Sequence, residues 1–222
     1  MQKRFDLVAF DLDGTLIDNR VAIRSNFNYA RGLHGYPPLP DNQIDSMIGT
    51  ALTEMFEKTL PESDKNLAPQ MVAEYRERYH NTSHEGVVIL DGVVGTLERL
   101  QSDGFKLAVA TTKVNDEVHP LLQRIELYRY FDLVTGSRKG LRTKPYPDMV
   151  LYIMKELGVI PERATLVGDT PTDVMTARNA GVYSIAVTSS IPLGFTTRDK
   201  IYSAKPDAII DSLRDVTTHL YI

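Results

Sequence analysis

The sequence predicts an α/β protein whose core is a doubly wound parallel sheet interrupted by a small α-helical domain. Two observations support the sheet. Short apolar runs alternate with helical stretches along most of the 222 residues, and most of these runs lack polar alternation. Strands buried on both faces of a parallel sheet have this composition. A third observation is a block from about Val21 to Glu85 that has helical patterns and no convincing strand.

Six apolar or β-branched runs, each bounded by Gly, Asp, Thr or Pro, are the predicted strands. They are Phe5–Phe10, Lys106–Thr111, Phe131–Val134, Ala164–Val167, Tyr183–Val187 and Asp207–Ile210. Helical periodicity covers residues 92–102, 115–127, 147–157, 172–180 and 211–220. Strand–helix alternation implies right-handed crossovers, and sheets of this kind bind ligands at the carboxyl ends of their strands.

The helical block interrupts this rhythm directly after the first strand. It contains four helical patterns, and a Gly- and Pro-rich segment at 35–40 marks a loop between the first two. We therefore expect residues 19–85 to form a separate cap or lid. Residues 1–18 and 86–222 would form the core.

Composition narrows the class of protein. Charged residues make up 24% of the chain, the formal net charge is −4 and both signs are mixed, so nucleic acid and membrane partners are not expected. The absence of cysteine excludes disulfides and thiolate chemistry. No segment approaches membrane-spanning length, so a cytoplasmic protein is expected. A monomer and a homodimer both remain open.

The first predicted strand ends in Asp11-Leu12-Asp13-Gly14-Thr15. Side chains alternate along an extended segment, so the two carboxylates point the same way. Two like charges in a small space are costly unless a cation or a proton transfer accounts for them. Mg²⁺ prefers such oxygen ligands. An acidic turn without a catalytic role is the alternative.

A second acidic motif follows a later predicted strand. Asp169 stands at the carboxyl end of that strand, and Asp173 lies one helical turn further on, where it could support the same cation. The alternative is a helix N-cap, because Asp and Thr are preferred at these positions.

Two further strand ends carry polar residues. Pro145 and Pro147 frame Lys144, and we expect them to fix its ammonium at the lip of the site, where it could neutralise carboxylate and phosphate charge. Thr111 and Thr112 end another strand, and a hydroxyl with a following N–H could bind phosphate oxygens. All four motifs therefore fall at one edge of the predicted sheet.

The order and types of these residues resemble the haloacid-dehalogenase superfamily over nearly the whole chain. Its first motif is matched by FDLDGTLID at 10–18, its threonine motif by Thr111, its lysine motif by Lys144 in KPYPD, and its acidic motif by GDTPTD at 168–173. The surrounding sequence is similar to the phosphoglycolate-phosphatase-like branch. That branch has a Rossmann-like core and a helical cap between the first two motifs. Asp91 is a departure, since many relatives have proline there.

The resemblance implies a magnesium-dependent phosphatase. Asp11 would attack phosphorus and form an aspartyl-phosphate, and Asp13 would protonate the leaving oxygen and then activate water. Asp11, the backbone carbonyl of Asp13, and Asp169 would hold Mg²⁺, with Asp173 supporting from nearby. Thr111 and the backbone around Thr112 would bind the phosphoryl group, and Lys144 would screen charge.

The substrate remains open on sequence alone. A small phosphate monoester such as 2-phosphoglycolate is expected, and a β-phosphoglucomutase-like phosphosugar mutase or a pyrophosphatase are alternatives. A non-catalytic binding module is the alternative from another class. Asp13 argues against dehalogenation, because the dehalogenases of the superfamily lack it. His80 and His84 have a spacing compatible with a metal, but a solvated pair is expected. Gly49 and its neighbours could form a substrate-facing loop of the cap.

Overall fold

The computed structural model describes residues 2–48, 50–191 and 196–222. The chain forms two compact units, and each is described by itself. The core unit comprises Met1–Asp18 and Ile89–Ile222, and the inserted unit comprises Asn19–Val88. Gly49, a residue of the expected cap loop, lies outside the described residues.

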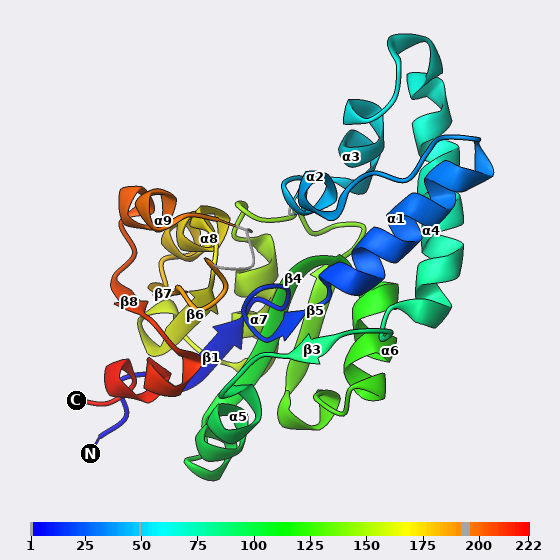
Figure 1. The fold of residues 1–222 in the computed structure, drawn as a ribbon. Coiled ribbons are helices and arrows are strands. Elements are labelled where there is room, and N and C mark those ends of the chain that lie inside the picture. The colour runs from blue at the N-terminus through cyan, green and yellow to red at the C-terminus, as the bar shows by residue number, and fades with distance from the viewer. Residues whose placement is uncertain (1, 49, 192–195) are drawn as a thin grey trace. The chain divides into compact units, whose positions relative to one another are not determined.

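The core unit contains a six-stranded sheet in the order β5-β4-β1-β6-β7-β8, and each neighbouring pair is parallel. Its strands are β1 Leu7–Phe10, β4 Lys106–Val114, β5 Leu133–Ser137, β6 Ala164–Gly168, β7 Tyr183–Val187 and β8 Ala208–Ile210. All six predicted strands are therefore present (Figure 1). β1 is central, and its last residue, Phe10, pairs with Val109 on one side and Val167 on the other.

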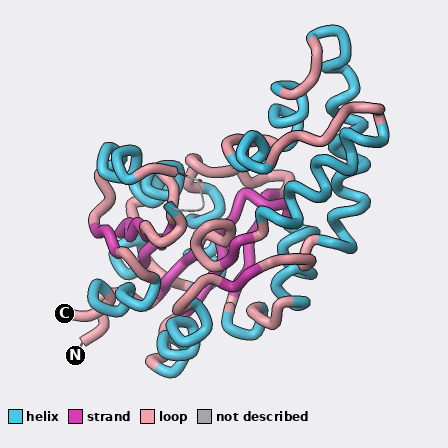
Figure 2. The backbone as a smooth tube through the Cα atoms, in the orientation of Figure 1, coloured by secondary structure: helices cyan, strands magenta, loops and turns pink. Residues whose placement is uncertain are grey.

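Helices cover both faces of the sheet, as a doubly wound fold requires (Figure 2). They are α5 Val93–Ser102, α6 Asn115–Arg124, α7 Asp148–Leu157, α8 Pro171–Ala180 and α9 Arg198–Ala204. Leu7 and Ala9 of β1 share a buried cluster with residues of α7 and α8. Val8 and Phe10 alternate to the opposite face and are also fully buried. The apolar runs without polar alternation thus reflect burial on both sides.

Three local predictions were wrong or incomplete. The stretch 211–220 forms the 3₁₀ helix η5, Leu213–His219, instead of an α-helix, and its β-branched residues Val216, Thr217 and Thr218 have low helix propensity. α9 was not predicted; its N-cap is Thr197, whose hydroxyl accepts a hydrogen bond from the Lys200 N–H. The small pair of β2 Ile17–Asp18 and β3 Val88–Ile89 was also missed, because two-residue strands carry no periodic signal.

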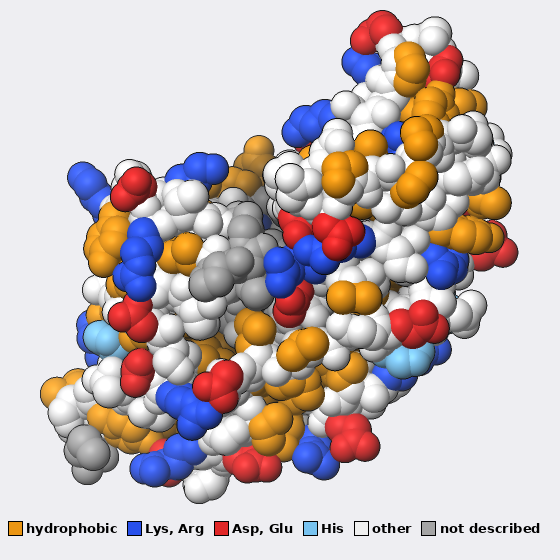
Figure 3. All heavy atoms as spheres, viewed as in Figure 1, with side chains coloured by type: hydrophobic (Ala, Val, Ile, Leu, Met, Phe, Trp, Pro, Cys, Tyr) orange, Lys and Arg blue, Asp and Glu red, His pale blue; other side chains and the backbone are white. Residues whose placement is uncertain are grey.

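The inserted unit is helical. It contains α1 Arg20–Leu33, α2 Asp41–Asp45, α3 Leu52–Lys58, the 3₁₀ segment η1 Glu62–Leu67 and α4 Ala68–Thr82. Its own apolar cluster includes a stacked pair, Phe27 and Phe56, with ring centroids 4.3 Å apart. No helix among the described residues is long and apolar enough to cross a membrane. On the face drawn in Figure 3, acidic and basic side chains are interspersed.

The end of β4 leaves the regular ladder with β5. Ala110 pairs with Thr135 and Val114 with Ser137, so β4 has two more residues than β5 over this interval. The extra length brings β4 close to Gly136, where a Cβ would stand 2.6 Å from the Lys113 carbonyl oxygen and 2.8 Å from the Asn115 nitrogen. The Gly136 N–H donates to Asn115 Oδ1 at 3.2 Å. Glycine is required here because backbone atoms occupy the position of a side chain.

Gly136→Ala is expected to lower the free energy of unfolding by about 1–3 kcal/mol, because the backbone of β4 cannot yield to a methyl group without shifting. Urea denaturation followed by circular dichroism measures this change. Gly95→Ala in α5 is the matched control, since a Cβ at Gly95 meets nothing within 4 Å and alanine favours a helix. If Gly136→Ala destabilises the protein no more than Gly95→Ala does, the close approach of β4 to Gly136 does not require glycine.

Candidate active site

Three carboxylates from two neighbouring strand ends meet at one edge of the sheet. Asp11 follows β1, Asp169 follows β6, and Asp173 lies in the first turn of α8. One side-chain oxygen of each lies within 4.8 Å of the others. The pairing of β1 with β6 continues into this edge, because the Asp11 N–H donates to the Val167 carbonyl oxygen at 2.8 Å. The sequence therefore identified the residues of one cluster.

Lys144 lies inside this cluster. Its Nζ donates to Asp11 Oδ1 at 2.7 Å and to Asp173 Oδ1 at 2.5 Å, and its side chain is only 2% exposed. The prediction that Lys144 stands at the lip of the site was wrong in this respect. The ammonium is a buried link between the two carboxylates, and the Asn179 side chain holds the adjoining loop by donating to the Pro145 carbonyl oxygen.

The start of α8 combines both interpretations of the second acidic motif. Thr170 and Asp173 form a reciprocal capping box, so Asp173 does stabilise the helix N-terminus. Asp173 Oδ2 accepts from the Thr170 N–H and hydroxyl, and this leaves Oδ1 for Lys144. Gly168 makes room for the carboxylate, since a Cβ at this position would stand 2.3 Å from Asp173 Cγ.

Two hydroxyls hold Asp169. Thr15 donates to Oδ1 at 3.0 Å and Ser190 donates to Oδ2 at 2.8 Å. Sequence analysis missed Ser190, which stands in no motif of fixed spacing. Its position shortly after the end of β7 was the available signal, because polar residues after parallel strands face the ligand edge.

The remaining predicted residues lie at the turn after β1 and in the irregular part of β4. Asp13 Oδ2 lies 3.4 Å from Lys113 Nζ, whereas Asp13 Oδ1 is buried and has no hydrogen-bond partner among the described residues. The buried Thr111 accepts from the Lys113 N–H at 3.2 Å. Thr112 is exposed, and no hydrogen bond within the described ranges joins it to the carboxylates.

Burial dominates the electrostatics of the cluster. It raises the pKa of Asp11 to about 7, although Lys144 acts in the opposite direction. Burial, followed by the charges of Asp11 and Asp173, also raises the pKa of Asp169 well above its usual value. For Lys144, burial alone would lower the pKa, but the two carboxylates outweigh it and the pKa is raised. The lysine therefore stays charged, whereas burial disfavours the ionised forms of Asp11 and Asp169.

The residues present fit a divalent cation. If all three carboxylates are ionised, they carry two more negative charges than the one ammonium offsets, and carboxylate oxygens are the ligands that Mg²⁺ prefers. Both oxygens of Asp173 and of Asp169 already accept hydrogen bonds, whereas no described residue donates to Asp11 Oδ2. Asp11 Oδ2 is thus the least engaged oxygen of the cluster. Neither His80 nor His84 belongs to a candidate metal cluster among the described residues.

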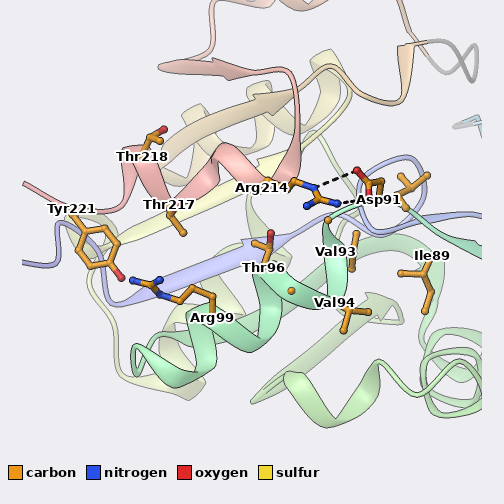
Figure 4. A pocket seen from close by; sticks show the side chains of 13 residues that line it. Ile89, Asp91, Val93, Val94, Thr96, Arg99, Arg214, Thr217, Thr218 and Tyr221 are labelled. Atoms are coloured by element: carbon orange, nitrogen blue, oxygen red, sulfur yellow. Dashed lines mark hydrogen bonds and ion pairs between the residues drawn. The ribbon is translucent and has the colours of Figure 1, made fainter.

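An open pocket of about 930 Å³ lies elsewhere on the core unit (Figure 4). It is lined by residues 89–96, by Arg99 of α5 and by Arg214, Thr217, Thr218 and Tyr221 at the carboxyl-terminal end. Arg214 there pairs with Asp91 at 2.6 Å. No member of the carboxylate cluster lines this pocket, so its size is no guide to the chemistry.

Comparisons with known proteins identify the family. A family model described as haloacid dehalogenase-like hydrolase matches residues 8–187. A probable phosphatase, IndB, from Dickeya dadantii is 35% identical, covering 95% of this chain and 91% of its own length. Phosphoglycolate phosphatase 1 from Pseudomonas aeruginosa is 32% identical, covering 95% of this chain and 78% of its own length.

Solved structures with the same fold belong to the same family. The crystal structure of a predicted phosphoglycolate phosphatase from Haemophilus somnus superposes with a TM-score of 0.84 at 25% identity, and the match covers 99% of each chain. Both the resemblance and the fold predicted from the sequence are confirmed. The chain belongs to the haloacid dehalogenase-like hydrolase family, in its phosphoglycolate-phosphatase-like branch.

Proposed function

We propose that this protein is a magnesium-dependent phosphatase that hydrolyses a small phosphate monoester through an aspartyl-phosphate on Asp11. One observation carries the proposal. Asp11 is buried beside Asp169 and Asp173, and Lys144 holds one of its oxygens while no described residue donates to the other. A carboxylate oriented in this way is suited to attack in line on phosphorus.

The first step forms a bond between Asp11 Oδ2 and phosphorus and breaks the ester P–O bond. Asp13, in its protonated form, donates its proton to the departing oxygen, so the leaving group departs as an alcohol. In the second step Asp13 takes a proton from water, and that water attacks the phosphorus of the aspartyl-phosphate. The Asp11 carboxylate is restored and inorganic phosphate is released.

Thr111 and Lys144 assist through charge and hydrogen bonding. Thr111 accepts from the Lys113 N–H, so its own O–H proton is available for a phosphoryl oxygen. Lys144 keeps one oxygen of Asp11 fixed and offsets part of the negative charge. Phosphoryl transfer depends mainly on such positioning and charge neutralisation.

When bound, Mg²⁺ would offset the charge of the phosphoryl oxygens and orient them for attack. Asp11, Asp169 and the Asp13 carbonyl are the proposed ligands, with Asp173 supporting them through Lys144 and the start of α8.

We further propose that the inserted unit acts as a cap that excludes bulk water during the reaction. Its place in the chain supports this role, because the insertion begins at Asn19, shortly after the catalytic turn. A cap of this kind restricts the size of substrates, and relatives named phosphoglycolate phosphatase favour a small ester.

Asp11→Asn is expected to lower kcat about 10³-fold or more, because the amide cannot form the covalent intermediate. The assay measures phosphate release from a panel of small phosphate esters with Mg²⁺. Asp215→Asn makes the same chemical change at an exposed position in η5 and serves as the control. An active Asp11→Asn variant with a normal circular dichroism spectrum would refute the assignment of the nucleophile. Release of an isomerised sugar phosphate from a hexose 1-phosphate, instead of phosphate, would indicate a mutase.

Mg²⁺ is expected to raise the Tm of the wild-type protein and EDTA to abolish activity. A cation present at about 100 times its Kd adds about 2.7 kcal/mol of stability. Asp169→Asn should lose most of this shift, because it removes a ligand charge while keeping the shape of the side chain.

The metal effect on Tm should also depend on pH. Burial raises the folded-state pKa of Asp11 to about 7, so the metal-free fold gains stability from protonation at low pH and loses it as the pH rises through about 7. Because protons compete with the cation, the increase in Tm caused by Mg²⁺ should be smaller at about pH 6 than at about pH 8.

If Mg²⁺ raises the Tm of the wild type and of Asp169→Asn equally, this result would count against a cation at this cluster.

A further inference from the structure

We propose that Lys113 selects substrates whose leaving group carries an anionic group, a carboxylate or a second phosphate, close to the ester oxygen. The inference rests on the proposed function and names the substrate class that the same site would take. Lys113 belongs to none of the motifs assigned a role above.

The backbone fixes the position of Lys113 closely. Its N–H donates to Thr111 Oγ1 at 3.2 Å, and its carbonyl oxygen occupies the space beside Gly136. The Asn115 side chain, which accepts from the Gly136 N–H, holds the next turn. Lys113 thus lies in the stretch where the register of β4 against β5 shifts, and its backbone is held on both sides.

The side chain leads into the site. It is only 8% exposed, and its Nζ lies 3.4 Å from Asp13 Oδ2. Lysine is rarely buried without a functional or structural partner, since removing an ammonium from water is costly. The ammonium accordingly belongs to the polar surroundings of Asp13.

The proposed role of Asp13 indicates which part of the substrate lies near Lys113. In the proposed reaction Asp13 gives its proton to the leaving oxygen, so this oxygen must come within hydrogen-bond distance of the Asp13 carboxyl. An ammonium beside the same carboxyl faces the leaving group. Lys144 differs, because it contacts Asp11 and therefore acts on the side of the nucleophile.

The chemistry of the ammonium defines the class of leaving group. An ammonium carries three N–H donors, so Lys113 can contact Asp13 and a substrate oxygen together. Charge-assisted hydrogen bonds to carboxylate or phosphate are roughly twice as strong as neutral ones. In a buried site this favours esters with an anionic group next to the ester oxygen over sugar phosphates, whose leaving groups are neutral alcohols.

The test compares two esters that differ in one group. 2-Phosphoglycolate carries a carboxylate where 2-hydroxyethyl phosphate carries a neutral alcohol, and pyrophosphate provides a second phosphate. The readout is the ratio of kcat/KM for each anionic substrate to kcat/KM for 2-hydroxyethyl phosphate. We expect Lys113→Met to lower the ratio for at least one anionic substrate by about 10- to 100-fold, the value of a hydrogen bond to a charged group.

Two further variants separate recognition from a structural role. Lys113→Arg keeps the charge and should recover part of the ratio. Lys155→Met removes an exposed lysine of α7 and should leave the ratio at its wild-type value. The identity of the affected substrate distinguishes carboxylate from phosphate recognition.

Unchanged ratios for both anionic substrates in Lys113→Met, with all rates falling together, would overturn the inference and leave a positioning role for Lys113. This outcome would not affect the proposed function, because phosphate esters would still be hydrolysed. A wild-type protein that hydrolyses no ester in the presence of Mg²⁺ would instead defeat the proposed function.

Discussion

The site depends on the burial of three carboxylates around one ammonium. Removing ions from water is costly, and the cost is recovered only when opposite charges and hydrogen bonds surround them closely. Lys144 supplies the opposite charge to Asp11 and Asp173. Burial, more than the neighbouring carboxylates, raises the pKa values of Asp11 and Asp169. The grouping of these buried carboxylates supports the proposal that the site holds a cation.

Much of the surrounding structure serves to hold these charges in place. The parallel pairing of β1 with β6 brings Asp11 and Asp169 to one edge, and Thr15 and Ser190 each donate to Asp169. The capping box at the start of α8 fixes Asp173, so one residue both stabilises a helix and orients Lys144. A side chain would fit at neither Gly168 nor Gly136, because the Asp173 side chain and the backbone of β4 occupy the positions where a Cβ would stand.

The sequence predicted the strands and the carboxylate cluster because both depend on local patterns. Apolar runs without alternation indicated a doubly wound sheet, and the polar residues that follow them converge wherever parallel strands end together. Features set by tertiary packing could not be predicted in this way. The depth of Lys144 depends on partners distant in sequence, Ser190 stands outside any motif, and the bend that positions Lys113 arises from unequal lengths of β4 and β5. Apolar periodicity predicted an α-helix over residues 211–220, but the residues around Val216 have weak helix propensity and the segment forms a 3₁₀ helix.

The central claim is that Asp11 becomes phosphorylated during turnover. The most direct test mixes excess protein with Mg²⁺ and an ester that the protein hydrolyses. The reaction is quenched with acid within one turnover, and the peptides are mapped by mass spectrometry. The account predicts one phosphoryl group on the peptide that contains Asp11, and on the same residue in every quenched sample before phosphate is released. A phosphoryl group on a different residue, or a burst of free phosphate with no phosphorylated peptide at any time, would contradict it.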